Sequence, residues 1–457
     1  MYLRRKIDDW LSKWKSQDSK IPALVVGIRQ CGKTESIKNF ASKHFKNIIY
    51  MNFWNNPEYI SLFDKSIEVN DLIQDITIQF PETKIDKDKT LIFFDEIQEC
   101  PRARLSFKNF KSDGRYYVIG SGSYLGINGY VIGDATAAPT GCEQVYNMNT
   151  MDFEEFLWAS NYDEKNINEL YLHFKKREKV PESSHNKYKK LFKQYLCVGG
   201  FPESVTEFLK THNIADSITI MNRIVFDMKT DFGRRKDKNN QPVFKAHEVA
   251  RIQNVFDLIP TFLAKESKRF ITSKISNGSS IDKSTAIEYL VQSHIVYKVH
   301  NLDIPSLPLK GNKIDSQFKL FPTDISILTN MYGVETIQAI YFDKLGIGKG
   351  AIYEALVFDS LYKANIDTFY YAKDTGLEID FVICYDNYSY LVETKAKDGN
   401  AKSCKTVMKN KDHYGITKLL KIGDYNVGEE NDILTIPHYM TFLLGRKDDF
   451  IVEDLTL

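Results

Sequence analysis

The chain has 457 residues, and its content of 43% hydrophobic and 26% charged residues is ordinary for globular proteins. A chain of this length corresponds to about three domains. The formal net charge of +1 excludes a global positive field that would draw the whole chain onto nucleic acid or a membrane, so any nucleic-acid contact requires a local patch.

Neither a membrane span nor an export signal is expected. No window approaches the roughly 18 consecutive apolar residues that a transmembrane helix needs. The charged segment 1–15 lacks the apolar stretch of a signal peptide. The six cysteines show no CxxC pairing and no metal-ligand spacing, which is typical of reduced thiols. We therefore expect a soluble protein of the cytoplasm.

In chain order, the first 150 residues alternate short apolar runs with helical patterns. The strands predicted from the apolar runs cover residues 21–26, 47–53, 90–94 and 116–119. Helical periodicity covers residues 33–44 and 71–80. This alternation predicts an α/β fold with a parallel, doubly wound sheet.

The composition changes at residue 152. Residues 152–231 have helical periodicity throughout, and 236–241 form a polar linker. Several short helices are predicted over 244–299, the last of which leads into a strand. A second linker, 305–313, precedes a second α/β unit with its own core. Its predicted strands cover 318–321, 368–371, 378–384 and 390–394, and its predicted helix covers 351–364.

The strongest motif is a glycine-rich loop between a predicted strand and a predicted helix, which fits the pattern GxxxxGK[ST]. It consists of Gly27, Ile28, Arg29, Gln30, Cys31, Gly32, Lys33 and Thr34. The glycines let the backbone wrap phosphates, and amides at a helix N-terminus present positive partial charge to an anion. We expect Lys33 to reach the β- and γ-phosphates and Thr34 to offer its hydroxyl to Mg²⁺. The loop therefore predicts a site for ATP and Mg²⁺.

A pair of acids follows the apolar run LIFF at the end of a predicted strand. Asp95 is expected to orient the Mg²⁺ shell, and Glu96 to polarise the water that attacks the γ-phosphate. Ser121, which ends the next predicted strand, is a candidate for contacting the γ-phosphate or the water. A plain turn remains an alternative for this serine. These residues predict a catalytic centre of Lys33, Asp95, Glu96 and Ser121.

The segments GIRQCGKT, LIFFDEIQ, GSGS, MDFEEFL and GGFPE together resemble prokaryotic AAA-plus ATPases that carry a C-terminal domain of unknown function with a restriction-endonuclease-like core. The resemblance covers nearly the whole chain. It implies a P-loop AAA-plus ATPase core over 1–150, a helical lid over 151–235, a winged-helix-like segment over 236–304 and a PD-(D/E)xK-like domain over 305–457. It also implies that Pro202 approaches the nucleotide base, although a simple helix-breaking turn would explain the same residues.

The sequence departs from this family at one position that could affect hydrolysis. Members usually have an arginine after the glycine that precedes the DFEEFL-like helix, whereas here Cys142 follows Gly141. If that arginine senses the γ-phosphate, hydrolysis is expected to be slow or to need an arginine from another subunit. Arg115 and the pair at 234–235 are candidate replacements, with an ordinary surface role as the alternative.

Acidic residues also recur in the terminal α/β unit. Glu354 lies on a predicted helix, Asp380 lies on a predicted strand, and Glu393 and Lys395 share one face of the following strand. A hairpin turn near 386–389 would bring Asp380 and Glu393 close enough to share one Mg²⁺. This matches the PD-(D/E)xK arrangement. An active nuclease, a degenerate or regulatory domain and an ordinary surface hairpin remain alternatives.

The segment 244–302 resembles a winged helix, with 284–289 on its recognition helix. Four basic residues are expected near that helix: Lys268, Arg269, Lys274 and Lys283. Such a module binds DNA in many proteins and serves as a protein contact in others.

Three functions therefore compete. The first is an ATP hydrolase that couples its nucleotide state to modules that bind DNA or protein. The second is an ATP-gated, Mg²⁺-dependent nuclease. The third is a nucleotide-dependent switch that does not hydrolyse ATP. A homo-oligomer or another protein partner remains open in each case, and no membrane partner is expected.

Overall fold

A computed structural model describes residues 1–124, 141–233, 243–265, 268–275, 279–344, 346, 349–395, 402–410, 414–416 and 418–446. The chain divides into two compact units. Unit 1 comprises Met1–Thr150 and Gln292–His294, and unit 2 comprises Met151–Val291 and Ile295–Leu457. Within the described ranges, no helix is both long enough and apolar enough to cross a membrane.

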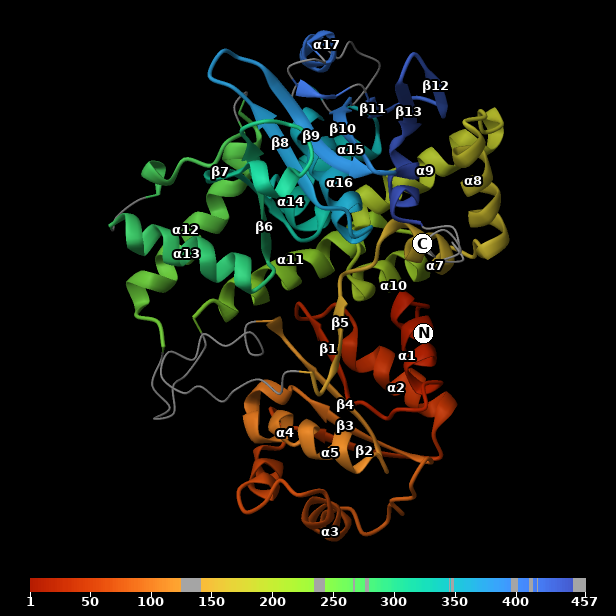
Figure 1. Cartoon of the computed structure of the whole chain (residues 1–457), viewed down its shortest axis with the longest axis vertical. Helices are drawn as coiled ribbons and strands as arrows, with labels where there is room; N and C mark the ends of the chain where they lie inside the picture. Colours follow the sequence, from red (N-terminus) through yellow and green to blue (C-terminus); the bar gives the residue numbers. More distant parts are fainter. Residues whose placement is uncertain are drawn as a thin grey trace, which may run out of the picture. The chain divides into compact units, whose positions relative to one another are not determined.

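Unit 1 is built on a five-stranded sheet in the order β2-β3-β4-β1-β5, and every neighbouring pair is parallel (Figure 1). The strands are β1 (Ala23–Gly27), β2 (Asn47–Asn52), β3 (Thr90–Asp95), β4 (Tyr117–Gly122) and β5 (Gln144–Met148). The predicted parallel sheet is therefore confirmed. Because the strands are parallel, the segments that follow β1, β3 and β4 emerge at the same edge of the sheet.

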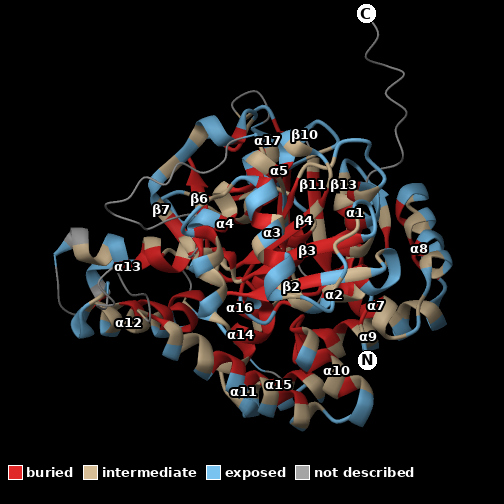
Figure 2. Cartoon of the chain, turned by 90° about the horizontal axis from the view of Figure 1, so that it is seen from below, coloured by how far each residue is buried: buried red, intermediate tan, exposed pale blue. Residues whose placement is uncertain are grey.

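The described residues of unit 1 also form the α-helices α1 (Lys6–Lys15), α2 (Lys33–His44), α3 (Val69–Gln79), α4 (Pro101–Leu105) and α5 (Phe107–Asp113). The predicted helices at 33–44 and 71–80 correspond to α2 and α3. Helix α1 packs on α2, and α2 packs on β1 and β2, as Figure 1 shows. Strand β3 is buried along its whole length (Figure 2), which explains its continuous apolar run, because a central parallel strand is covered on both faces.

Unit 2 combines helices with an eight-stranded mixed sheet in the order β12-β13-β11-β10-β9-β8-β6-β7. Its strands are β6 (Val296–Leu302), β7 (Lys313–Pro322), β8 (Thr368–Ala372), β9 (Glu378–Tyr385), β10 (Tyr388–Thr394), β11 (Lys418–Gly423), β12 (Gly428–Glu430) and β13 (Ile433–Pro437). Strand β10 pairs parallel with β11 and antiparallel with β9. The predicted strand–helix alternation of this region is confirmed.

The helices of unit 2 precede and interrupt its sheet. They are α7 (Phe153–Ala159), α8 (Glu164–Lys176), α9 (Glu182–Val198), α10 (Pro202–Thr211), α11 (Ile214–Asp231), α12 (Ala246–Leu263), α13 (Ser280–Gln292), α14 (Ile325–Met331), α15 (Val334–Tyr341), α16 (Lys349–Lys363) and α17 (Lys402–Lys409). Helix α16 packs on β7, β8 and β10, whereas α17 packs on β9 and β10. The helical nature predicted for 152–231 is confirmed by α7 to α11.

Two expectations for the middle of the chain differ from the structure. Instead of several short helices, residues 246–263 form one helix, α12, which continues through Pro260 because its apolar face is buried. The expected linker 305–313 joins β6 to β7, which pair antiparallel within one sheet. This segment is therefore a connection between neighbouring strands. The predicted polar linker 236–241 lies outside the described residues.

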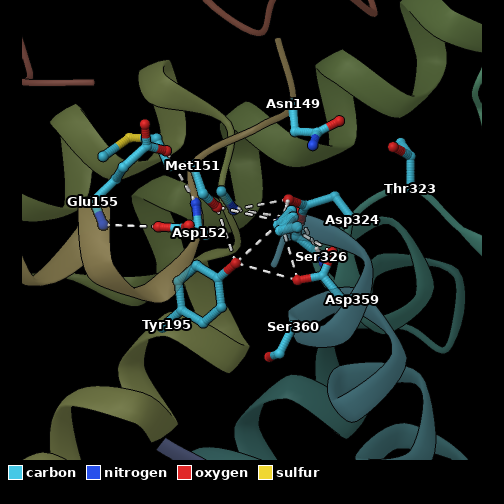
Figure 3. Close-up of polar contacts among 12 residues, drawn as sticks. Asn149, Met151, Asp152, Glu155, Tyr195, Thr323, Asp324, Ser326, Asp359 and Ser360 are labelled. Carbon is cyan, nitrogen blue, oxygen red and sulfur yellow. Dashed lines mark hydrogen bonds and ion pairs between the residues drawn. The ribbon is translucent and has the colours of Figure 1, made fainter. Parts of the chain in front are cut away.

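A buried charged cluster lies where α9, α14 and α16 meet (Figure 3). The ammonium of Lys363 is 2.9 Å from carboxylate oxygens of both Asp324 and Asp359, and it donates to the hydroxyl of Tyr195 at 3.0 Å. The carbonyl of Met151 accepts from the Tyr195 hydroxyl at 2.9 Å and from Lys363 at 3.2 Å. The cluster thus fixes the start of unit 2 to its helical core.

The glycine pair of the GGFPE segment belongs to this cluster. Gly199 has φ +77°, and a side chain there would clash with Ser326. A side chain at Gly200 would clash with the carbonyl of Met151. The N–H of Met151 donates to the carbonyl of Gly200 at 2.7 Å. The amide of Gly200 also donates to Asp324 at 3.1 Å. Close backbone packing therefore accounts for both glycines.

Candidate functional site

The glycine-rich loop of unit 1 connects β1 to α2 at the carboxyl edge of the sheet. Gln30 and Gly32 have φ values of +63° and +99°, so the loop turns through left-handed backbone twice. At Gly32 this conformation favours glycine, and Gly32 is also the residue that caps α2. The first amides of α2 therefore face the loop, as an anion site at a helix N-terminus requires.

Gly27 is fixed by its neighbours. Strand β5 pairs with β1 so that Met148 lies beside Gly27, and a side chain at Gly27 would clash with the carbonyl of Met148. The same side chain would come within 2.8 Å of the Cys31 thiol, which is fully buried. Glycine is needed here for packing, independently of any phosphate. Arg29 and Gln30, by contrast, are exposed, and the Arg29 guanidinium lies 6.0 Å from the ring of Trp54.

Lys33 is buried within the loop. Its ammonium donates to the carbonyls of Gly27 at 2.9 Å and Ile28 at 2.8 Å. The positive charge is thus held within the curve of the loop, where it can face phosphate oxygens.

A buried arginine from the N-terminal segment supports the loop. The guanidinium of Arg5 donates to the carbonyl of Cys31 and to the carbonyl of Asn149, both at 2.7 Å. Arg5 therefore ties the loop to the segment after β5. The sequence prediction missed this residue, because nothing in a charged N-terminal helix marks one arginine as buried.

Asp95 is the centre of the site. Its Oδ2 accepts from the hydroxyl of Thr34 at 3.0 Å, from the hydroxyl of Tyr50 at 2.9 Å and from the amide of Asn52 at 3.1 Å. Its Oδ1 accepts from the hydroxyl of Ser121. The structure thus brings the predicted Thr34, Asp95 and Ser121 together and adds two residues from the end of β2.

The two added residues are uncharged donors. Burial raises the pKa of Tyr50 to about 12, and the carboxylate of Asp95 acts in the same direction, so the phenol remains protonated. Asn52 is 8% exposed. The sequence signal for these residues was a polar pair at the end of the apolar run NIIYMN, at the same sheet edge as Asp95.

Glu96 follows Asp95 with φ +51°, a left-handed conformation that is uncommon for glutamate. Its carboxylate accepts from the side-chain amide of Gln98 at 2.5 Å, and its side chain is half-buried. This strained backbone conformation turns the side chain of Glu96 away from the direction of β3. The hydrogen bond from Gln98 then orients the Glu96 carboxylate. Such strain is common at functional sites.

The donor set of this site fits a magnesium ion. Hydroxyl and carboxylate oxygens are the ligands that Mg²⁺ prefers, and the hydroxyl of Thr34 lies 3.0 Å from Oδ2 of Asp95. The surrounding donors are uncharged and can reorient when a cation approaches. Thr34 and Asp95 are thus the residues that would hold the ion.

The arginine candidates do not reach this edge. Arg115 pairs with Asp113 at 2.8 Å and precedes β4, so it lies at the opposite, amino edge of the sheet. Cys142 likewise lies two residues before β5, at the amino edge. The glycine-rich loop lies at the other end of β5, beside the last residue of that strand, Met148. At about 3.3 Å per residue, position 142 is of order 15–20 Å from the loop. An arginine at 142 would therefore not contact the phosphates held by the same chain. The pair 234–235 lies outside the described residues.

The predicted terminal set converges in unit 2. The β9–β10 hairpin turns through Asp386 and Asn387, both with positive φ, as predicted. Among the described residues, however, no group of three or more histidine, cysteine, aspartate or glutamate side chains is arranged to hold a metal ion. Glu354 and Glu393 form ion pairs with lysines. Asp380 accepts a hydrogen bond from the backbone N–H of Thr394.

The predicted lid and recognition-helix residues also lie in unit 2. Pro202 is the first residue of α10, and its approach to a nucleotide base stays a prediction. Residues 284–289 lie on α13, where Ser284 is exposed and Tyr289 is buried. Lys268, expected near this helix, instead forms an ion pair with Glu354. DNA contact through this segment stays a prediction.

The phosphate loop, the acid pair on β3 and the parallel sheet define unit 1 as a P-loop nucleoside triphosphatase fold. Residues 19–157 match the family described as "AAA domain". This match supports an AAA-type P-loop ATPase domain over these residues, a class that binds ATP. Residues 189–338 match a domain of unknown function, DUF8612, and residues 349–439 match another, DUF4143. None of the curated proteins matches the chain significantly.

Three solved structures are similar to parts of the chain. The Walker-type ATPase PABY2304 of Pyrococcus abyssi is 13% identical, with 72% of this chain and 96% of that chain covered and a TM-score of 0.41. The ORC2 protein of Aeropyrum pernix in its ADP form is 13% identical, with 75% and 95% covered and a TM-score of 0.28. The Hsp104–ADP complex of S. cerevisiae is 11% identical, with 80% of this chain but only 43% of that chain covered and a TM-score of 0.27.

Proposed function

We propose that the chain hydrolyses ATP and that its nucleotide state changes the conformation of the modules in unit 2. The observation that carries this proposal is the contact between the phosphate loop and the acid strand, the 3.0 Å hydrogen bond from Thr34 to Asp95. It joins the second residue of α2 to the last residue of β3, as a shared Mg²⁺–phosphate site requires.

Each residue has a separate role in this proposal. The amides of the loop and the ammonium of Lys33 bind the β- and γ-phosphates and stabilise the negative charge that develops on them. Glu96 accepts a proton from the attacking water, and Gln98 holds its carboxylate at 2.5 Å in one orientation. Bound Mg²⁺ would add charge neutralisation at the phosphate oxygens. Ser121, which contacts Asp95, acts by positioning that carboxylate.

The proposed output is a change in unit 2 that alters binding of DNA or of a protein partner. The connection supports this idea, because Asn149 is held by Arg5 in unit 1 and Met151 is held by Tyr195 and Lys363 in unit 2. A single residue separates these two anchor points. A shift of the phosphate loop that moves Arg5 would therefore be passed to the chain that enters unit 2.

Phosphate release by the purified full chain with ATP and Mg²⁺ tests the proposal. Glu96→Gln should still bind ATP but should lower turnover by about 100-fold or more, because it removes the general base. Lys33→Ala should lose both binding and turnover. Lys43→Ala, an exposed lysine on the same helix, is the matched control and should behave as wild type. Equal phosphate release from wild type, Lys33→Ala and Glu96→Gln would reject ATP hydrolysis.

A nucleotide-dependent switch without hydrolysis is the second candidate. One observation favours it: position 142 holds a cysteine. An arginine at this position could act on the nucleotide of a neighbouring subunit, and cysteine cannot replace it. Tight ATP binding by wild type, with turnover no faster than that of Glu96→Gln, would establish the switch.

A further inference from the structure

A second cluster of carboxylates lies in unit 2, where α16 and β9 approach β7 and β10. Its acids are Glu354 on α16, Glu378 and Asp380 on β9, and Glu393 on β10. Glu354 is 1% exposed and Glu393 is 8% exposed. Burial of several carboxylates is costly unless positive charge compensates them, so the cations that surround these acids decide what the cluster can do.

Two lysines neutralise the negative charge of Glu354, the acid on α16. Lys319, which is fully buried on β7, lies 3.0 Å from Oε1 of Glu354 and 3.0 Å from Oε1 of Glu378. The ammonium of Lys268 contacts Oε2 of Glu354. Both oxygens of Glu354 are therefore bound by ammonium groups. Lys319 also links three elements, because its two carboxylate partners lie on α16 and β9.

The acids on the hairpin are occupied by other donors. Oε1 of Glu393 lies 2.5 Å from the ammonium of Lys395, and its Oε2 accepts from the thiol of Cys404 at 3.4 Å. Oδ2 of Asp380 accepts from the backbone N–H of Thr394 at 2.8 Å. Asp380 and Glu393 were expected to share one Mg²⁺. Three of their four carboxylate oxygens are already in contact with donors of the protein.

The charge states agree with these contacts. Burial opposes ionisation of Glu354, yet Lys319 and Lys268 hold the pKa of this carboxyl below its usual value. Burial likewise opposes the charge on Lys319, but Glu354 and Glu378 raise its pKa well above the ordinary value. Lys319 and Glu354 therefore both remain charged and form a stable ion pair.

A divalent cation does not fit this set of residues. Four carboxylates face three ammonium groups, which leaves an excess of one negative charge at most. A cation would have to bind beside three like charges or displace one of them, and of the three the Lys319 side chain is the most buried, at 1% exposed. Leaving a lysine such as Lys319 buried and unpaired is strongly destabilising, as it is in other buried ion pairs.

We infer that internal ammonium groups, Lys319 foremost, take the place of a divalent cation in this cluster, which binds no metal and fastens β7 to α16 and β9. The residues that resemble a nuclease site are then a structural charge cluster. The inference rests on the contacts of Lys319 and Lys268 and is independent of the proposed ATP hydrolysis.

Titration of the nucleotide-free full chain with Mn²⁺, followed by the electron paramagnetic resonance signal of free Mn²⁺, tests the inference. Wild type and Asp380→Asn should bind the same amount of Mn²⁺ up to about 100-fold excess over protein. Asp95→Asn reports separately any ion held beside the phosphate loop. One Mn²⁺ per chain that is lost in Asp380→Asn but kept in Asp95→Asn would overturn the inference.

Removal of the ammonium provides the converse test. Lys319→Met should gain about one bound Mn²⁺ per chain, and the gain should disappear in the double variant Lys319→Met/Asp380→Asn. A folded Lys319→Met chain, judged by circular dichroism, that binds no additional Mn²⁺ would overturn the role of Lys319. Should this variant not fold, the comparison of wild type with Asp380→Asn still decides the question.

Discussion

Two of the buried acidic clusters in the described part of the chain differ in what surrounds the carboxylates. In unit 1, Asp95 accepts hydrogen bonds at 2.9–3.1 Å from the uncharged side chains of Thr34, Tyr50 and Asn52. In unit 2, each oxygen of Glu354 contacts an ammonium group, that of Lys319 or Lys268. A neutral hydrogen bond contributes about 1 kcal/mol and can be exchanged for a cation, whereas a buried ammonium cannot be displaced so easily.

This difference shows that the number and spacing of acids do not identify a metal site. The sequence patterns at 95–96 and at 380–395 are both acids at the ends of strands. Only the partners that the fold supplies distinguish an acid that is ready to bind Mg²⁺ from one that is already neutralised. Substitutions at four positions test this difference between the clusters and the roles of the residues around them.

The largest expected effect is on stability. Lys319→Met leaves the carboxylates of Glu354 and Glu378 without their common ammonium, so the free energy of unfolding should fall by about 3–5 kcal/mol, measured by urea denaturation. Glu354 keeps its ion pair with Lys268, whereas Glu378 loses its ammonium, so the double variant Lys319→Met/Glu378→Gln should regain part of this loss.

A matched control comes from the edge of the same cluster. The Lys395 side chain is 30% exposed, so Lys395→Met should cost no more than about 1 kcal/mol. A loss below about 1 kcal/mol for Lys319→Met as well would mean that the buried pair contributes no more than a surface ion pair.

The next effect is on turnover in unit 1. Asn52→Ala removes a donor that orients Asp95, and loss of such a supporting partner typically lowers metal affinity or activity by about 10–100-fold. The Mg²⁺ concentration required for half-maximal ATP hydrolysis should rise accordingly. Asn56→Ala, at a half-buried asparagine of the same segment whose side chain contacts Glu58 and not Asp95, should leave it unchanged. Identical Mg²⁺ dependence for both variants would remove Asn52 from the site.

A third buried set tests how lysine compensation depends on pH. Burial raises the pKa of Asp359 to about 7, although Lys363 opposes this; Asp324 and Tyr195 face the same carboxyl. Between about pH 4 and pH 7 the folded chain retains a proton that the unfolded chain loses. The free energy of unfolding should therefore fall as pH rises, by up to about 1.4 kcal/mol per pH unit.

Replacement of this carboxyl isolates its contribution. Asp359→Asn cannot titrate, so the free energy of unfolding should depend less on pH between pH 5 and pH 8 than in wild type. Urea denaturation at several pH values measures the difference. Parallel curves for wild type and Asp359→Asn would show that this carboxyl does not titrate in that window.

The smallest effect is expected at Cys142. Because this residue lies at the amino edge of the sheet, Cys142→Arg should change turnover by less than about 2-fold at low protein concentration. An increase that appears only at high protein concentration would indicate action between subunits. An increase of about 10-fold at every concentration would contradict the placement of residue 142 away from the loop.

The sequence predicted the local parts of the candidate site well. A glycine-rich loop between an apolar run and a helical pattern is a continuous segment, so β1, the loop and α2 could be read from adjacent residues. The acids after β3 followed from the same rule. The boundaries of β1 to β4 differ from the prediction by three residues at most.

Partners from distant segments could not be predicted. Arg5, Asn52 and Lys319 have their roles because strand order and register bring them to a carboxylate or a carbonyl, and no local pattern encodes that neighbour. Lys319 nevertheless carried a signal, since it interrupts the apolar run FKLF of β7. A lysine inside the buried half of a strand needs a carboxylate partner, and Glu354 is such a partner.

The guanidinium of Arg5 has a practical consequence for defining the ATPase domain. The family match begins at residue 19, yet Arg5 holds the carbonyl of Cys31 inside the loop from a helix that precedes that boundary. A fragment trimmed to the matched range would keep every motif residue and lose this support. The segment that confers nucleotide affinity is thus longer than the segment that sequence comparison recognises, and excised versions of this domain should begin at the first residue.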